Sequence, residues 1–177
     1  TPCAWVLAAL CGGGQAAANL LWDHRYADAG WITQLLASAG WFGILEVTYG
    51  AAVLPRGQAK WLAAGNAGKL AGMVLLIPLG YHLDGFRGAV LGIVLSEVVR
   101  YLLAAWALHR LGLRGWPTDL MLSLWVAATS WIGWQSALWA QHVNGSPVFA
   151  AAIVFIAVTL AWSPLGHTVY ARFFKGE

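Results

Sequence analysis

Three charged residues lie deep inside long apolar runs of this sequence, namely Glu46, Glu97 and Arg100. Inside a bilayer, a charge near the centre costs at least about 2.5–3.5 kcal/mol, so such residues are usually paired or functional. Glu97 lies three residues before Arg100, within reach for an ion pair on one helix. Either this pair only neutralises itself so that the helix can insert, or Arg100 attracts an anionic substrate group such as a phosphate, with Glu97 as its competitor.

Small residues accompany Arg100 at helical spacing. Gly88, Gly92, Ser96 and Arg100 are four residues apart, so they share one helix face. Small residues on such a face let another backbone approach closely. Arg100 is therefore expected to point toward protein or toward a cavity.

Glu46 shares a helix face with Gly43 and Gly50, so it is also expected to point into protein. It is either a protonatable coupling site, since burial raises the pKa of a carboxyl group, or a neutral buried acid bonded to a neighbouring helix. Lys69 lies a turn or two inside its apolar run. Its long side chain is expected to carry the ammonium to the lipid headgroups.

A second polar cluster precedes the second apolar run and contains Asp23, His24, Arg25 and Asp28. An acid and a base could meet a substrate there, and Arg25 is a further candidate for substrate binding. The alternative is a solvated loop in which Asp28 caps the following helix.

Other chemistries lack their sequence signatures. Gly12, Gly13 and Gly14 are followed by Gln15 rather than by Lys and Ser or Thr, so there is no phosphate-binding loop. This glycine run instead loosens a helix or lets it pack closely. The five His form no HExxH pair, and we expect no metal, no cofactor and no catalytic residue.

The composition is that of an integral membrane protein of class all-α. The chain is 60% hydrophobic and 10% charged, whereas soluble domains carry about 25% charged residues. The basic residues form no continuous patch, so a nucleic acid partner is not expected. Backbone groups in lipid must be satisfied internally, which makes the spans helices. We expect one transmembrane domain over residues 1–177, with spans at about 3–21, 29–54, 61–83, 86–109, 119–141 and 147–170.

Alternate loops differ in charge, which predicts the orientation. Seven Lys or Arg residues lie at one set of span ends and two at the other, with Arg100 left inside a span. By the positive-inside rule, the first set and the C-terminus face the cytoplasm.

Several segments together carry a family resemblance. Residues 22–31 resemble the outer-loop segment of bacterial polysaccharide-biosynthesis flippases, which belong to the multidrug/oligosaccharidyl-lipid/polysaccharide (MOP) exporter superfamily. Residues 54–70 are similar to the family's next inner loop and helix start. Residues 78–80 and 85–92 resemble its glycine-rich turn, and Ser96 with Arg100-Tyr101 continues the match.

The resemblance covers about residues 5–114 and implies a transporter of two six-helix lobes, with optional extra helices after the second. It implies alternating access around a cationic cavity and a substrate that is an oligosaccharide linked to undecaprenyl diphosphate. On this basis the chain is expected to be part of the C-terminal lobe plus two extra helices, in contact with membrane lipids and with an N-terminal lobe that is not in this sequence.

The function that we expect is therefore flipping of this lipid-linked oligosaccharide in the bacterial inner membrane, for polysaccharide export, by a transporter rather than an enzyme. Arg100 and Glu97 would handle the diphosphate, and Glu46 is a possible coupling group. One alternative is a small-molecule or multidrug exporter of the same superfamily. Another is a membrane-embedded polysaccharide polymerase or ligase, which would need a larger outer loop than this sequence has.

Overall fold

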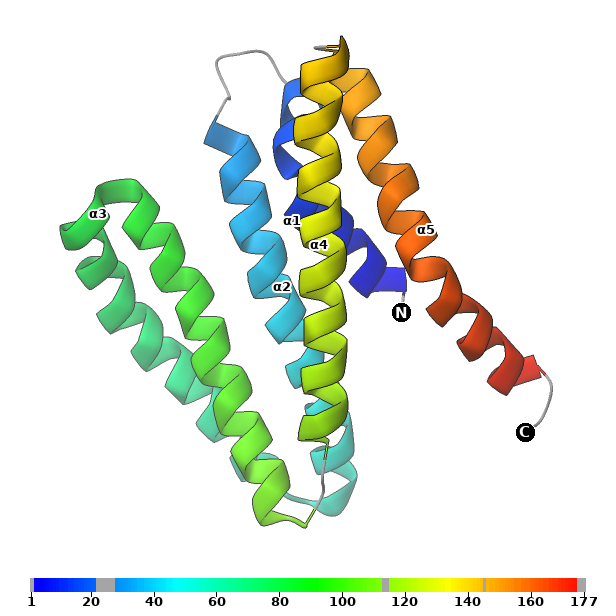
Figure 1. Ribbon diagram of the computed structural model, residues 1–177. Helices are drawn as coiled ribbons and strands as arrows, with labels where there is room; N and C mark the ends of the chain where they lie inside the picture. The colour runs from blue at the N-terminus through cyan, green and yellow to red at the C-terminus, as the bar shows by residue number, and fades with distance from the viewer. Residues whose placement is uncertain (1, 22–27, 113–114, 145, 175–177) are drawn as a thin grey trace. The chain divides into compact units, whose positions relative to one another are not determined.

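The computed structural model describes residues 2–21, 28–112, 115–144 and 146–174 (Figure 1). Side chains are described up to Ser163, apart from those of Pro2, Trp116, Asn144 and Pro147. The described residues form helices and no strand, which confirms the all-α prediction. In chain order the elements are α1 (Pro2–Leu21), α2 (Asp28–Val53), the 3-10 turn η2 (Leu54–Arg56), α3 (Ala59–Arg110), α4 (Trp116–Asn144) and α5 (Pro147–Phe174).

The long element α3 covers the two segments predicted at 61–83 and 86–109. It is not one straight helix, because Asp84 (φ −142°, ψ 29°) and Gly85 (φ 56°, ψ −138°) leave the helical region of backbone space. A φ of +56° suits a residue without a Cβ, which is why the reversal falls at a glycine. The chain doubles back there, as the green hairpin in Figure 1 shows, so the predicted break at Asp84-Gly85 is confirmed.

Three of these helical stretches are long and apolar enough to cross a membrane by length and composition: Cys3–Leu21, Asp28–Arg56 and Ala59–Arg110. A shorter apolar stretch is Val148–Ser163. These are findings for the described residues. A helix needs about 20 apolar residues to cross a bilayer core, so each arm of the α3 hairpin has the required length.

The chain divides into two compact units, and the division falls within α2 and within α4. Unit 1 contains Thr1–Gln34 and Ser123–Glu177, and unit 2 contains Leu35–Leu122. Each unit has its own packing.

Unit 1 is organised around α1, where Gly12, Gly13 and Gly14 face three different helices. A Cβ on Gly12 would lie 2.6 Å from the backbone oxygen of Ser130 on α4. A Cβ on Gly13 would lie 2.7 Å from Val154 Cγ1 on α5, and one on Gly14 would lie 2.7 Å from the Gln34 side chain on α2. Successive residues point about 100° apart around a helix, so three glycines in a row open three sides of α1. Of the two roles expected for this run, loosening the helix or letting it pack closely, the structure shows close packing.

Unit 2 is built on the α3 hairpin, whose arms meet through small residues. The backbones of Gly80 and Gly88 touch, so a Cβ on either would overlap a carbonyl group of the other. Farther from the turn, a Cβ on Gly72 would lie 3.3 Å from the Ser96 side chain. The small-residue face predicted at Gly88, Gly92 and Ser96 is thus the face on which the first arm packs, and it fixes the register of the hairpin.

Candidate functional site

Four charged side chains from three helical segments of unit 2 form a continuous cluster. Glu46 comes from α2, Lys69 from the first arm of α3, and Glu97 and Arg100 from the second arm. Arg100 Nη2 lies 2.8 Å from Glu46 Oε2, and Arg100 Nη1 lies 3.8 Å from Glu97 Oε2. Lys69 Nζ donates a hydrogen bond to Glu97 Oε1. Acid and base therefore alternate in the order Glu46, Arg100, Glu97, Lys69, and the four formal charges cancel.

The cluster is mostly removed from the surface. The exposed fraction of the side chain is 5% for Glu46, 15% for Glu97, 21% for Arg100 and 26% for Lys69. Removing unpaired charges from water is very unfavourable, so a buried set is stable only when each charge meets an opposite one. The alternation meets that condition, and the Glu46–Arg100 contact has the length of a charge-assisted hydrogen bond.

The hydrogen bonds of the cluster are nevertheless incomplete. Among the residues that the structure describes, neither Arg100 Nε nor Glu97 Oε2 has a hydrogen-bond partner, although both atoms are buried. The 3.8 Å separation of Arg100 Nη1 and Glu97 Oε2 permits electrostatic attraction but is too long for a hydrogen bond. A guanidinium has five N–H donors, so Arg100 retains capacity for another acceptor.

The hairpin register explains why these charges meet. Gly72 packs on Ser96, and a Cβ on Gly65 would lie 3.9 Å from Arg100 Cγ. Between the Gly72–Ser96 and Gly65–Arg100 contacts, side chains of the two arms face one another, which places Lys69 beside Glu97. Close approach of the backbones is thus the condition for the ion pair.

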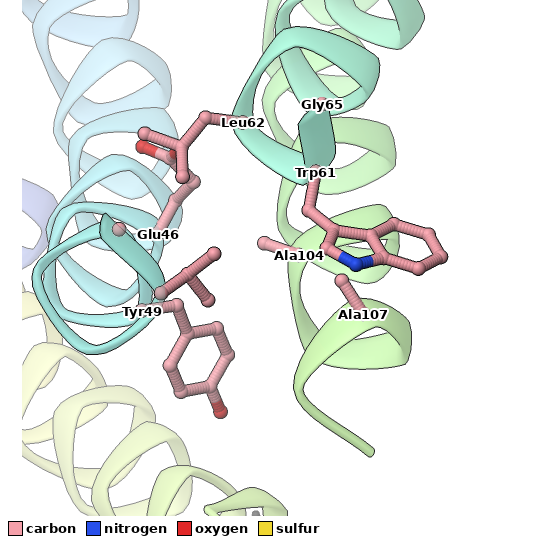
Figure 2. Close-up of a pocket in the computed structure, with 9 residues that line it drawn as sticks. Glu46, Tyr49, Trp61, Leu62, Gly65, Ala104 and Ala107 are labelled. Carbon is pink, nitrogen blue, oxygen red and sulfur yellow. The ribbon is translucent and has the colours of Figure 1, made fainter. Parts of the chain in front are cut away.

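A small cavity of about 10 Å³ lies beside Glu46, between α2 and the two arms of α3 (Figure 2). Its walls include Tyr49 on α2, Trp61 and Leu62 on the first arm, and Ala104 on the second. A volume of about 10–15 Å³ holds about one water molecule. The space beside Glu46 therefore suits a single water rather than a substrate.

Aromatic side chains continue from this cavity toward α4. The rings of Tyr49 and Tyr101 are stacked with centroids 5.9 Å apart, and Tyr101 Oη donates to Asp119 Oδ2 at 3.1 Å. Asp119 is buried in the first turn of α4. This hydrogen bond ties the second arm of α3 to the start of α4 within unit 2.

The structure brings together most, but not all, of the residues singled out in the sequence. Glu97 and Arg100 lie within ion-pair distance as expected, and Glu46 contacts the same guanidinium. Lys69 does not follow the expectation, because its ammonium contacts Glu97 rather than extending away from the helices. Glycines on both sides of Lys69 were the available sign of a packed face. Arg25 lies outside the described residues.

No metal site is indicated within the described part of the chain, since no group of three His, Cys, Asp or Glu residues there could hold an ion. Comparisons with family models, with curated protein sequences and with solved structures found no match to this chain.

Proposed function

We propose that this chain is a multi-pass protein of the bacterial inner membrane and part of a transporter that flips an oligosaccharide linked to undecaprenyl diphosphate. In this proposal the two arms of α3 count as two spans, which with α1, α2, α4 and α5 makes six. The C-terminus faces the cytoplasm, as the distribution of basic residues favours.

Membrane insertion is supported by the apolar side chains on the surface of the α3 hairpin. Leu70, Val74, Leu75, Leu79 and Leu83 of the first arm are all more than half exposed. Soluble monomers rarely expose such a continuous apolar face, whereas lipid accepts it. The first two helices also have the length and composition of spans.

The transport proposal rests on the burial and the contacts of Arg100. Its guanidinium lies among apolar helices, is held by two carboxylates, and keeps a buried N–H without a partner. In a state in which the surrounding helices have moved apart, a phosphate oxygen can accept from that buried N–H and displace the long contact with Glu97. A cation that is stabilised in the resting protein and still able to bind an anion is what reversible handling of a diphosphate requires.

The same cluster gives less support to an exporter of cationic small molecules. Such a protein would present a carboxylate to its substrate, but Glu46 and Glu97 both already contact a cation. The arrangement therefore favours an anionic substrate.

The test uses the complete gene that encodes this chain, in its host. Arg100→Ala is compared with Arg110→Ala, a control that removes an exposed arginine stacked on Trp106 of the same arm. Protein level, surface polysaccharide and lipid-linked oligosaccharide in the cytoplasmic leaflet are measured for both.

We expect Arg100→Ala to accumulate substrate in the cytoplasmic leaflet and to lose surface polysaccharide by more than any fall in its protein level explains, while Arg110→Ala behaves as the parent. Normal export by Arg100→Ala would leave Arg100 as a structural partner of Glu46 and would refute the transport role.

A further inference from the structure

The open end of the α3 hairpin, opposite its turn, carries two cations that lie against two indoles (Figure 1). On the first arm, Lys60 Nζ lies 5.9 Å from the ring centroid of Trp61, and on the second arm Arg110 Cζ lies 5.0 Å from that of Trp106. The two indoles meet edge to face with centroids 5.3 Å apart. An indole attracts a cation within about 6 Å of its centroid. The contact between the indoles therefore gathers one cation from each arm into a single indole–cation patch of Lys60, Trp61, Trp106 and Arg110.

The positive charge of this patch is exposed and uncompensated. The side chains of Lys60 and Arg110 are both exposed, and Trp106 is 48% exposed. Between described residues, every ion pair belongs to the buried charged cluster and none involves Lys60 or Arg110. An anionic partner would therefore meet two cations without first displacing a carboxylate of the described structure.

An apolar stripe runs from the patch along the second arm. Leu102 and Leu95 precede Trp106 by four and eleven residues, spacings that place all three on one helix face. The two leucines are 57% and 51% exposed. One leaflet is half of a core of about 30 Å, or about ten residues of helix. The stripe therefore has about the depth of one leaflet, with the cations at its end.

The turn end of the hairpin lacks this combination. Its apolar side chains are just as accessible, since Leu83 and Phe86 are 76% and 61% exposed. Its cation, Arg87, follows the acid Asp84 by three residues, and the sequence between Trp61 and Trp106 contains no Trp. Apolar surface is thus common to both ends, whereas unbalanced charge and indoles are found at the open end.

We propose that the indole–cation patch binds the headgroup of an anionic phospholipid such as phosphatidylglycerol. Lys60 and Arg110 attract its phosphate, and an acyl chain follows Leu102 and Leu95. Charged donors form strong hydrogen bonds to phosphate oxygens, and indoles favour the headgroup level of a bilayer. Basic residues at the cytoplasmic surface attract the anionic lipids of that leaflet. A zwitterionic lipid would bring a cation of its own to a patch that already has two.

This proposal rests on the membrane insertion and orientation given under the proposed function, but not on transport. None of the four residues of the buried charged cluster belongs to the patch. The bound lipid would hold the open end of the hairpin at the cytoplasmic headgroups. Lys60 remains in the single variant Arg110→Ala, so that variant keeps a cation at the patch and still serves as the export control.

The experiment measures lipid binding to the whole chain in detergent micelles by native mass spectrometry. Phosphatidylglycerol and phosphatidylcholine with identical acyl chains are titrated separately, and glycerol 3-phosphate is tested as a competitor without chains. The variants are Lys60→Gln/Arg110→Gln, the charge-conserving Lys60→Arg/Arg110→Lys, and the single variants Arg110→Gln and Arg87→Gln. The last two make the same change at opposite ends of one arm, so Arg87→Gln is the matched control. Circular dichroism checks that each variant is folded.

We expect the parent to bind phosphatidylglycerol about 5- to 30-fold more tightly than phosphatidylcholine, at about 5-fold for each cation. Arg110→Gln should lower this preference by about 5-fold, and Lys60→Gln/Arg110→Gln should bind the two lipids alike. Lys60→Arg/Arg110→Lys, Arg87→Gln and Arg100→Gln should keep the preference of the parent. Glycerol 3-phosphate should not compete.

Equal binding of both lipids by the parent would overturn the proposal, as would an equal loss in Arg110→Gln and Arg87→Gln. Competition by glycerol 3-phosphate would indicate a site for a soluble phosphate and would also overturn it. Failure of the membrane proposal has a different result, namely a chain that is soluble without detergent and binds neither lipid. Export by Arg100→Ala tests the transport role separately.

Discussion

The glycine run of α1 makes a prediction that can be worked out from distances. Replacing Gly12 by Ala would place a Cβ 2.6 Å from the Ser130 carbonyl oxygen and 3.0 Å from Gly133 Cα. Both obstacles are backbone atoms of α4, so no side-chain rotation relieves the contact. To restore even a 3.0 Å separation, α1 and α4 must move apart locally by about 0.4 Å.

The expected loss follows from two opposing effects. Overpacking typically destabilises by about 1–3 kcal/mol, and fixed backbone atoms favour the upper end of that range. Alanine gains about 1 kcal/mol over glycine in a helix interior. We therefore expect Gly12→Ala to lower the free energy of unfolding by about 2 kcal/mol, which for a chain of this length corresponds to a Tm lower by about 4–8 °C.

Gly43→Ala is the matched control, since a Cβ at Gly43 meets no atom within 4 Å in the described structure. Gly43→Ala gains the higher helix propensity of alanine without a new close contact, so its Tm should rise by about 1–4 °C. The measurement is thermal unfolding of the purified variants in one detergent, followed by circular dichroism. Equal Tm values for Gly12→Ala and Gly43→Ala would refute the argument that contact with α4 requires a glycine at position 12.

Three further changes test other parts of the molecule in the same unfolding assay. Arg100→Met leaves the buried Glu46 carboxylate without its cation and should lower the free energy of unfolding by about 3–5 kcal/mol. Adding Glu46→Gln should restore most of that loss in the double variant. No recovery in the double variant would contradict the pairing of Glu46 with Arg100. Gly85→Ala forces a Cβ into a backbone conformation with φ 56° and ψ −138° and should cost about 1–3 kcal/mol, so an unchanged Tm would argue against the tight turn of α3. Trp162→Phe removes the indole N–H that donates to Thr129 Oγ1 at 3.3 Å. It should lower the free energy of unfolding by about 1 kcal/mol in the parent but by much less in a Thr129→Ala background. Equal losses in both backgrounds would exclude this hydrogen bond as the cause.

The helices and their breaks could be predicted because they depend on local sequence. Long apolar runs between turn residues predict helices of membrane length, and Asp84-Gly85 is a turn signal that needs no knowledge of the fold. The Glu97–Arg100 pair was predictable for the same reason, since a spacing of three places both side chains on neighbouring turns of one helix.

The remaining contacts of the cluster depend on register between segments. Lys69 meets Glu97 only because Gly72 packs on Ser96 across the hairpin, and a slip of one residue would turn Lys69 to another side. The pairing of Glu46 with Arg100 likewise depends on how α2 packs on the hairpin. Spacing within one helix carries no information about such alignments, so the sequence named no partner residue for Glu46 and placed the Lys69 ammonium at the lipid headgroups.

The same limit applies to the glycine run. The helical repeat alone indicates that Gly12, Gly13 and Gly14 open three directions, but it does not say which helix fills each. That choice is made by residues far along the chain, including Ser130 and Val154.

This separation has a consequence for biosynthesis. The side of α1 opened by Gly14 can be covered as soon as α2 is made, but the side opened by Gly13 waits for Val154, about 140 residues later in translation. Until α5 is made, the backbone at Gly13 lacks the Val154 side chain that covers it. The packing around α1 is therefore complete only when α5 has been made, and a chain truncated before α5 would leave Gly13 uncovered and should be less stable.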